Sequence, residues 1–309
     1  MYKVFIKTKK YIPNKERTMK TPLILRSLLT AAVIAALPVS LANAQDRFAN
    51  VEVKATAIKG AVHMLTGAGG NIGVSAGDDG VLIIDDQFAP LAEKIAEQLG
   101  ELGSDKPKFV INTHYHGDHT GSNAFFHSHK GATILAHENV RIRLASDEKV
   151  APEALPTITY EDGIKIYFNG ETLHVIHLAV GHTDGDSAVL FEQPNVLHTG
   201  DLFFNGRFPY IDQGAGGNVE GYMESVQQLL NRIDDDTVII PGHGALSNKA
   251  EYANFLGMIS ETFNYVKALK EEGKSLDDVK AMGLEEKWAS WSWNFINEEK
   301  WITTLYNDA

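Results

Sequence analysis

The chain has 309 residues, of which 44% are hydrophobic, a formal net charge of -12 and no cysteine. A chain of this length and composition buries a sizeable core, which excludes a disordered protein or a fibre. Without cysteine the protein has no disulfides and no thiolate ligands, so any bound metal must be held by His, Asp or Glu.

The N-terminal residues have the three-part pattern of a secretory signal peptide. Lys20 and Arg26 come before an apolar run, Leu28 to Leu41, which ends in Ala42-Asn43-Ala44. This run has about fourteen residues and contains Pro38, whereas a membrane-spanning helix needs roughly 20. The pattern therefore favours a signal cleaved after Ala44, a periplasmic or secreted protein, and no stable membrane anchor.

The charge of the remaining chain bears on its partners. Residues 1–18 form a lysine-rich stretch longer than an ordinary signal start, which favours Met19 over Met1 as the true start and residues 19–44 as the signal. Removal of residues 1–44 takes away eight Lys or Arg and one Glu, so the net charge changes from -12 to -19. Such a surface repels phosphate backbones, which disfavours nucleic-acid partners and favours a small-molecule substrate. No pattern specifies an oligomeric state.

From residue 45 onward, short apolar runs alternate with segments of helical periodicity, and no repeat or change of composition divides the chain. Strands are predicted at 81–85, 109–112, 133–136, 164–168, 172–177, 187–191, 195–199 and 237–240, and helices at 90–102, from 138, at 219–233 and over most of the chain after 247. This order predicts sheets with helices outside them in one domain, 45–309. One late helical stripe is interpreted as core packing, namely Phe255, Ile259, Phe263, Val266 and Leu269.

Four potential metal ligands lie within six residues, in the motif H-x-H-x-D-H that follows a predicted strand. In an extended segment His114 and His116 point to the same side, because side chains alternate with a period of two. Asp118 and His119 begin a helix and point past that pair. The motif therefore predicts that one pair serves one ion and the next pair serves its neighbour.

Three further potential ligands stand in glycine-flanked turns that follow apolar strands: His182, Asp201 and His243. Seven ligands at four strand ends are enough for two ions. Zinc suits imidazole and carboxylate ligands, and a catalytic zinc site keeps a position for water. The other histidines are interpreted as ordinary core or surface residues: His63, His127, His129, His137, His174, His177 and His198.

In this order and spacing, the motifs resemble those of the metallo-β-lactamase superfamily over nearly all of residues 45–309. The resemblance implies an α/β layered fold, an αββα sandwich with the metal site at one edge of two facing sheets. It also implies two Zn²⁺ ions per chain and a ligand set: His114, His116 and His182 for the first ion, Asp118, His119 and His243 for the second, and Asp201 as the bridge.

The chemistry that the resemblance implies is hydrolysis by a metal-bound hydroxide that attacks an acyl carbon, with Asp118 orienting the water. The substrate stays open between a β-lactam, a lactone, a thioester and a related ester. Residues 181–190 resemble the corresponding segment of true lactamases. One lactamase subclass, however, has a cysteine where Asp201 stands and a lysine where Phe204 stands. A bridging Asp is typical of glyoxalase II, lactonases and other hydrolases of the superfamily.

Candidate substrate contacts come from the aromatic loop after the bridging residue. Arg207 is a candidate to hold a substrate carboxylate, and Tyr210 is a candidate donor to an oxyanion. The interpretation we favour for Arg207 is a structural salt bridge. The glycine-rich segment 212–218 is interpreted as a mobile loop near the mouth of the site. Four tryptophans are expected to attach the last helices to the body of the domain: Trp288, Trp291, Trp293 and Trp301.

Two alternative functions remain open at this point. Persulfide dioxygenases have a similar histidine motif with one iron, but they depend on a glutathione pool that an exported protein does not normally meet. A non-catalytic metal-binding protein on the same scaffold is the other alternative, which seven intact ligands disfavour. Two zinc ions per chain would support hydrolysis, whereas one iron would support the oxygenase.

Overall fold

The computed structural model describes residues 47–178 and 180–309, all of which belong to one compact unit. The signal sequence predicted at 19–44 and the extension before it lie outside the described residues. None of the helices in the described ranges has the length and apolarity needed to cross a membrane.

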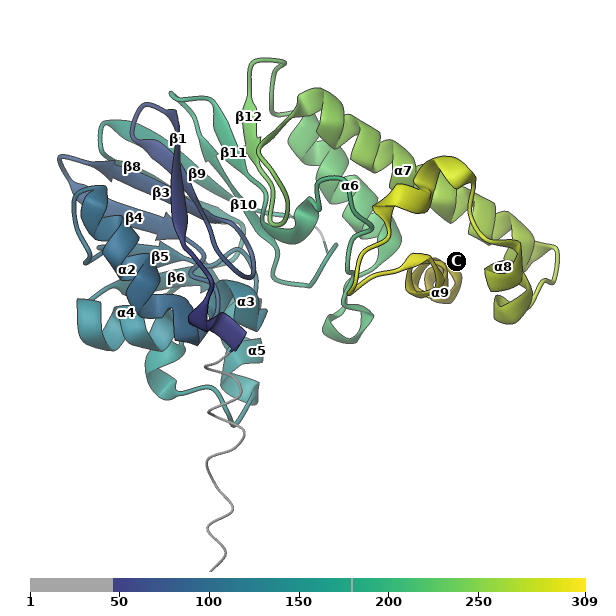
Figure 1. Cartoon of the computed structure of the whole chain (residues 1–309), viewed down its shortest axis with the longest axis horizontal. Helices are drawn as coiled ribbons and strands as arrows, with labels where there is room; N and C mark the ends of the chain where they lie inside the picture. Colours follow the sequence, from purple (N-terminus) through teal and green to yellow (C-terminus); the bar gives the residue numbers. More distant parts are fainter. Residues whose placement is uncertain (1–46, 179) are drawn as a thin grey trace, which may run out of the picture. The chain divides into compact units, whose positions relative to one another are not determined.

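Two β-sheets form the centre of this unit (Figure 1). The first sheet has the strand order β1-β2-β3-β4-β5-β6-β7: Lys54–Lys59, Val62–Thr66, Ile72–Gly77, Gly80–Ile84, Phe109–Ile111, Thr133–His137 and Ile158–Tyr160. The second has the order β13-β12-β11-β10-β9-β8: Ser247–Asn248, Val238–Ile240, Val196–His198, Ser187–Phe191, Glu171–His177 and Gly163–Phe168. Strands β4, β5, β6 and β7 pair in parallel, as do β11 and β12, so their carboxyl ends lie at the same edge.

Helices cover the outer faces of both sheets. The α-helices are α2 Ala92–Glu101, α3 Gly117–Thr120, α4 Asn123–Lys130, α5 Glu138–Ser146, α6 Val219–Leu230, α7 Lys249–Glu271, α8 Leu276–Met282 and α9 Glu298–Asp308. Short 3₁₀ turns are η1 Ala89–Leu91, η2 Pro152–Ala154, η3 Gly200–Leu202, η4 Gln213–Ala215 and η5 Glu286–Trp291. Helices α2 and α4 pack on the first sheet, and α6 and α7 pack beside the second (Figure 1).

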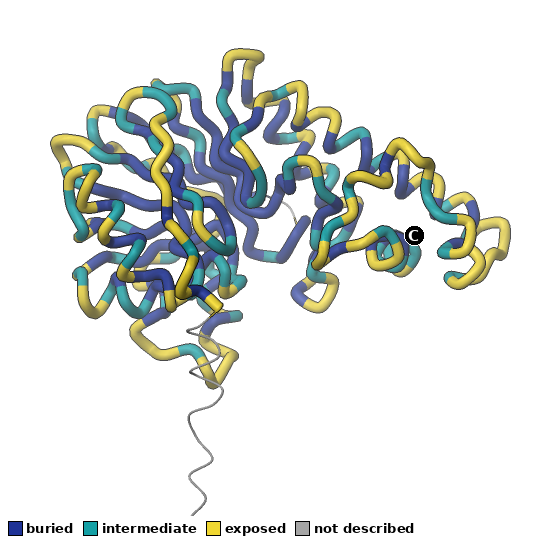
Figure 2. Tube along the Cα trace, in the orientation of Figure 1, coloured by how far each residue is buried: buried dark blue, intermediate teal, exposed yellow. Residues whose placement is uncertain are grey.

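The alternation of side chains along the strands produces this layering. In β4, Leu82 and Ile84 are buried in the cluster between the two sheets. Their neighbours Val81 and Ile83 point the other way, into the cluster beneath α2 and α4. Buried positions accordingly run along the central strands (Figure 2). Because both faces of such strands are covered, they are continuously apolar in sequence. The αββα arrangement predicted from the sequence is confirmed.

The outer layer of the second sheet contains the late helical stripe. Phe255, Ile259 and Val266 of α7 are fully buried against α6 and α9, in one cluster with Trp301. The interpretation of that stripe as core packing is confirmed. A fully buried aromatic residue such as Trp301 contributes on the order of 3 kcal/mol to stability through apolar burial.

All eight predicted strands are present, but five further strands of the described residues were not predicted, namely β1, β2, β3, β7 and β13. β1 is an edge strand with the sequence KATAIK, and most of its residues are exposed. It has neither an apolar run nor a clear alternation, and lysines at its ends are typical of edge strands that avoid further pairing. Of the α-helices, α4 was also not predicted.

Candidate metal centre

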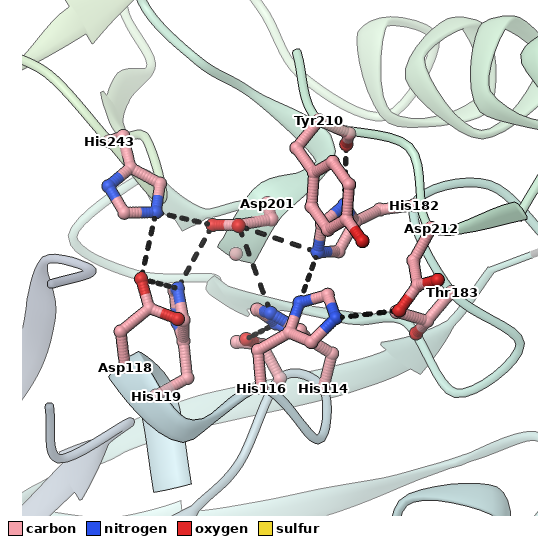
Figure 3. A network of polar contacts seen from close by, with 12 residues as sticks. His114, His116, Asp118, His119, His182, Thr183, Asp201, Tyr210, Asp212 and His243 are labelled. Carbon is pink, nitrogen blue, oxygen red and sulfur yellow. Dashed lines mark hydrogen bonds and ion pairs between the residues drawn. The ribbon is translucent and has the colours of Figure 1, made fainter. Parts of the chain in front are cut away.

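Seven side chains from four separate loops meet at one end of the sheets (Figure 3). His114, His116, Asp118 and His119 follow β5, and Asp201 lies in η3 after β11. His182 precedes β10 and His243 follows β12. Two sets of ligand atoms result, each with its atoms within 4.8 Å of one another. The first ligand group is His114, His116, His182 and Asp201, and the second ligand group is Asp118, His119 and His243.

Asp201 lies between the two groups and turns one oxygen to each. Its Oδ2 is 3.4 Å from His182 Nε2 and 3.8 Å from His114 Nε2, both in the first group. Its Oδ1 is 3.1 Å from His119 Nε2 and 3.4 Å from His243 Nε2, both in the second. A carboxylate that faces two sets of imidazoles in this way has the geometry of a bridging ligand.

Several of these atoms are buried without a partner, which tests whether the residues fit metal ions. Within the described residues, His114 Nε2, His119 Nε2 and Asp201 Oδ1 make no hydrogen bond of acceptable geometry, although His119 Nε2 and Asp201 Oδ1 lie 3.1 Å apart. Buried polar atoms in folded proteins nearly always have one, because an unpaired group costs roughly 1–3 kcal/mol. The three atoms all point into the ligand cluster, and imidazole with carboxylate is a donor set that suits zinc. The residues therefore fit two divalent cations.

In the first ligand group, burial keeps the imidazoles of His114 and His182 neutral. Burial lowers the pKa of His182 to about 4, although Asp201 acts against this shift. Burial likewise lowers the pKa of His114 well below its usual value, and the neighbouring His119 adds to the effect. Because a metal ligand must be deprotonated, these two rings are ready to bind at neutral pH.

In the second ligand group, carboxylates outweigh burial. Burial alone disfavours a charged His243, but Asp201 and Asp118 raise its pKa to about 9. The pKa of His119 is raised well above its usual value against burial, by Asp201, Asp85 and Asp118. Burial also opposes ionisation of Asp118, yet His119 and His243 lower its pKa. Without metal, this group holds protons at neutral pH.

Two polar residues behind the ligands were not predicted from the sequence. Asp85 Oδ2 lies 2.7 Å from His119 Nδ1 and accepts a 2.8 Å hydrogen bond from the Thr113 hydroxyl. That hydroxyl is 3.0 Å from His114 Nδ1. Asp85 has a φ of +64°, which is uncommon outside glycine and is typical of functional sites. It immediately follows β4, so its position at a strand end was the signal that sequence reasoning overlooked.

Glycines allow the backbone to approach the ligands closely. A Cβ atom on Gly242 would lie 2.2 Å from Asp201 Oδ1, and one on Gly70 would lie 2.1 Å from His119 Cε1. Neither distance is compatible with a side chain at that position. The glycine before His243 is thus required by the packing around the Asp201 carboxylate.

A cavity of about 800 Å³ opens over the ligand cluster. It is lined by His116, Asp118, Asp201 and His243, and by several aromatic and cationic side chains, namely Phe88, Phe204, Tyr210, Trp293, Phe295, Arg47 and Arg207. Phe204 stacks on the ring of His243, with centroids 4.9 Å apart. The cavity is thus mainly aromatic, with the candidate metal ligands at its base.

The cavity changes two interpretations made from the sequence. Arg207 forms no ion pair within the described residues, and its guanidinium lies 5.4 Å from the ring centroid of Trp293. The structural salt bridge favoured from the sequence is therefore absent from that part of the chain. Trp293 lines the cavity, whereas Trp288 and Trp301 are buried in the core as expected, and Trp291 packs against that core. The sequence alone did not show which tryptophan faces the ligands.

The loop predicted to be mobile is attached to the first ligand group. Asp212 Oδ2 lies 3.0 Å from His116 Nε2 and accepts a 2.6 Å hydrogen bond from the Tyr115 hydroxyl. The carbonyl of Tyr210 is 2.7 Å from His182 Nδ1. Asp212 had no assigned role in the sequence analysis, because nothing in the motif points to a residue so far along the chain.

Comparisons with known proteins identify relatives of this chain. The family model of the metallo-β-lactamase superfamily matches residues 65–243. A hydroxyacylglutathione hydrolase of Polaromonas sp. is 32% identical over 146 residues, 46% of this chain and 51% of that protein. The metallo-β-lactamase IND-1 of Chryseobacterium indologenes is 31% identical over 134 residues, 43% of this chain and 54% of that protein. The matches thus span about half the length of these two relatives.

A solved structure supports the fold. A metallo-β-lactamase from Pontibacter korlensis superposes with a TM-score of 0.59 at 20% sequence identity, covering 68% of this chain and 99% of that one. The family model matches more than half of the chain and ends at His243. The chain therefore belongs to the metallo-β-lactamase superfamily.

Proposed function

We propose that the protein is a two-zinc hydrolase that cleaves an acyl-type bond in a small molecule. The observation that carries the proposal is the bridging geometry of Asp201, whose two oxygens face two separate sets of imidazoles. His114, His116 and His182 would hold the first ion, and Asp118, His119 and His243 the second. When bound, such a metal pair supplies a nucleophile from water at neutral pH and polarises the bond under attack.

Side chains that line the cavity would orient the water and stabilise the developing charge. Asp118 faces the cavity, and its lowered pKa keeps the carboxylate ionised at neutral pH, so it can accept a hydrogen bond from the attacking water and orient it. Burial and the nearby Asp212 raise the pKa of Tyr210, which therefore keeps its proton and can donate to an oxygen that becomes negative. The aromatic walls exclude bulk water from the acyl group.

Arg207 is proposed to select the substrate. It lines the cavity, is held against Trp293, and has no carboxylate partner in the described residues. A guanidinium in this setting suits an anionic group, with the aromatic walls contacting the apolar part of the same molecule. The relatives include a hydroxyacylglutathione hydrolase and a β-lactamase. We therefore propose an acyl substrate that also carries a carboxylate, such as a β-lactam, a glutathione thioester or a lactone derivative.

We also propose that the protein works outside the cytoplasm, after removal of residues 1–44. The support is the signal-peptide pattern that ends in Ala42-Asn43-Ala44. Expression of the full chain in a bacterial host and mass measurement of the periplasmic product test this. A product that starts at Gln45 is expected, and a full-length cytoplasmic product contradicts export.

Metal analysis and a substrate screen test the hydrolase. Purified protein is expected to contain two zinc ions per chain, and one iron would instead favour an oxygenase. Nitrocefin, an acyl-homoserine lactone, a glutathione thioester and an aryl phosphate are offered to the wild type, to Asp118→Ala and to the control Asp277→Ala. Asp277 is an exposed carboxylate in the first turn of α8.

The expected result is turnover of at least one acyl compound that is lost in Asp118→Ala and kept in Asp277→Ala. Turnover of the aryl phosphate alone contradicts the acyl assignment. Two bound metals without turnover of any compound favour a binding protein on the same scaffold.

A further inference from the structure

We propose that Asp212 is a positioning residue that fixes His116 for the first of the two metal ions, and that the loop Tyr210–Asn218 supports the first ligand group without supporting the second. This inference rests on the proposed metal pair. It concerns only residues of the chain and how they hold the ligands, so metal affinity tests it independently of catalysis.

The two nitrogens of His116 have different partners. Nε2 lies 3.0 Å from Asp212 Oδ2, and Nδ1 on the opposite side of the ring lies 2.9 Å from His182 Nε2 (Figure 3). A neutral imidazole that donates its proton through Nε2 keeps its lone pair on Nδ1. Asp212 therefore selects the tautomer whose lone pair points at the ligand cluster. A carboxylate behind a metal-binding histidine also makes that ring a stronger ligand.

Asp212 is itself held on both carboxylate oxygens. Oδ2 accepts the 2.6 Å hydrogen bond from Tyr115 in addition to the contact with His116, and Oδ1 accepts from the Ala215 backbone at 3.1 Å. A carboxylate fixed by three donors has no alternative rotamer that keeps them all. The orientation of His116 is therefore determined by the fold.

The Tyr115 ring is itself held by a cation–π contact with Arg143. The guanidinium of Arg143 lies 5.5 Å from the Tyr115 ring centroid and forms a 2.6 Å ion pair with Asp184. Asp184 follows His182 by two residues, and its backbone N–H donates to Ala215 in the same loop. The residues that orient His116 and those that orient His182 are thus joined by a continuous series of contacts.

The loop also holds His182 directly. The carbonyl of Tyr210 lies 2.7 Å from His182 Nδ1, which leaves Nε2 to face Asp201. Backbone bonds run from Asp212 N to His182 O at 2.9 Å and from Asn218 N to Gly181 O at 3.0 Å. Two of the three histidines of the first ligand group therefore take their orientation from one segment of nine residues.

The second ligand group depends on other segments. His119 is oriented by Asp85 after β4, and His243 is stacked on Phe204. Within the described residues, no hydrogen bond joins the loop 210–218 to Asp118, His119 or His243. A change at Asp212 is accordingly expected to weaken one ion and spare the other.

Single-site backgrounds separate the two groups. The variant Asp118→Ala keeps the first ligand group intact, and the variant His114→Ala keeps the second ligand group intact. Zn²⁺ affinity is measured in each background by competition with a chromophoric chelator, with and without Asp212→Ala. Loss of a carboxylate behind a metal-binding histidine typically weakens binding about 10- to 100-fold. We expect this loss of Zn²⁺ affinity when Asp212→Ala is added to Asp118→Ala, and no change in affinity when it is added to His114→Ala.

Three comparison variants sharpen the result. Asp212→Asn keeps an acceptor oxygen for His116 without the charge, so it is expected to lose less affinity than Asp212→Ala, and it carries the test if the alanine variant does not fold. Tyr115→Phe removes one donor to Asp212 and is expected to have a smaller effect still. Asp85→Asn is expected to show the opposite preference, weakening the second group.

Two results would overturn the inference. One is unchanged Zn²⁺ affinity of the first group when Asp212 is replaced. The other is an equal loss in both backgrounds, which would make the loop a support of the whole site. Wild-type protein that binds no zinc would refute the proposed function, whereas wild-type and Asp212→Ala proteins that bind two ions equally well would refute only this inference.

Discussion

The two ligand groups on either side of Asp201 contain similar residue types but hold their protons differently. In the first group, burial lowers the pKa values of His114 and His182. In the second, neighbouring carboxylates raise those of His119 and His243 despite burial. Asp201 faces both groups, but in the second group Asp118 acts together with it on His119 and His243, and Asp85 also acts on His119. Similar residue types therefore do not make equal sites, because the carboxylates around the imidazoles decide whether a metal must displace a proton.

Replacement of the shared residue is expected to have the largest effect, because it removes a ligand from both groups. Asp201→Asn keeps the size of the side chain but removes the charge that faces four imidazoles. We expect turnover of the substrate found in the screen to fall at least on the order of 10³-fold. Zinc content by atomic emission is expected to fall below two ions per chain. A variant with two zinc ions and wild-type turnover would show that Asp201 is not a bridge.

Much of this arrangement was predictable because the ligand types stand in recognisable local patterns. The H-x-H-x-D-H motif and the three glycine-flanked turns identify His114, His182, Asp201 and His243 without knowledge of the fold, since each follows or precedes an apolar strand. The central strands were predictable for the same reason, because burial on both faces requires apolar runs.

The supports of the ligands were not predictable, because they depend on contacts between distant segments. Asp212 reaches His116 across 96 positions, and Asp85 reaches His119 across 34. No local spacing encodes either contact. Trp293 is likewise indistinguishable in sequence from Trp291, and only the path of the chain after η5 places one in the cavity and the other against the core.

Zinc is expected to stabilise the folded protein through both groups, and the loss of one group should halve the effect. At a free zinc concentration about 100 times the dissociation constant, each site adds about 2.7 kcal/mol to the free energy of unfolding. Thermal unfolding of metal-free wild type, Asp118→Ala and His114→Ala with added zinc measures this. Each single-site variant is expected to show about half the wild-type increase, and an unchanged increase in either would contradict two separate sites.

The pH dependence of zinc binding is expected to differ between the groups. The pKa of His243 is raised to about 9 from 6.5, so its protonated form stabilises the metal-free protein. That contribution is complete below pH 6.5 and is lost as the pH rises through about 9. Because zinc binds the deprotonated ring, its affinity for the second group should rise at least about tenfold per pH unit between pH 7 and 9.

The zinc affinity of the first ligand group is expected to depend much less on pH. His182, with a pKa of about 4, has no proton to lose in this range, and His114 is also neutral. Zinc affinity in the Asp118→Ala background should therefore vary with pH much less than in the His114→Ala background. Calorimetry in buffers of different ionisation enthalpy counts the protons released. Equal proton release from both groups would remove the distinction between them.

The smallest effect is expected at Arg207, which lies beside Trp293 near the second ligand group and touches no ligand. Arg207→Ala should raise KM for a substrate with a carboxylate by about tenfold, the value of one charge-assisted contact, and leave kcat nearly unchanged. Arg207→Lys keeps the positive charge but not the planar guanidinium, so its KM should lie between those of the wild type and Arg207→Ala. A neutral ester of the same substrate is the control, since its KM should not respond. A fall in kcat with unchanged KM would instead assign Arg207 to the reacting end of the cavity, next to the metal ligands rather than at the substrate's anionic group.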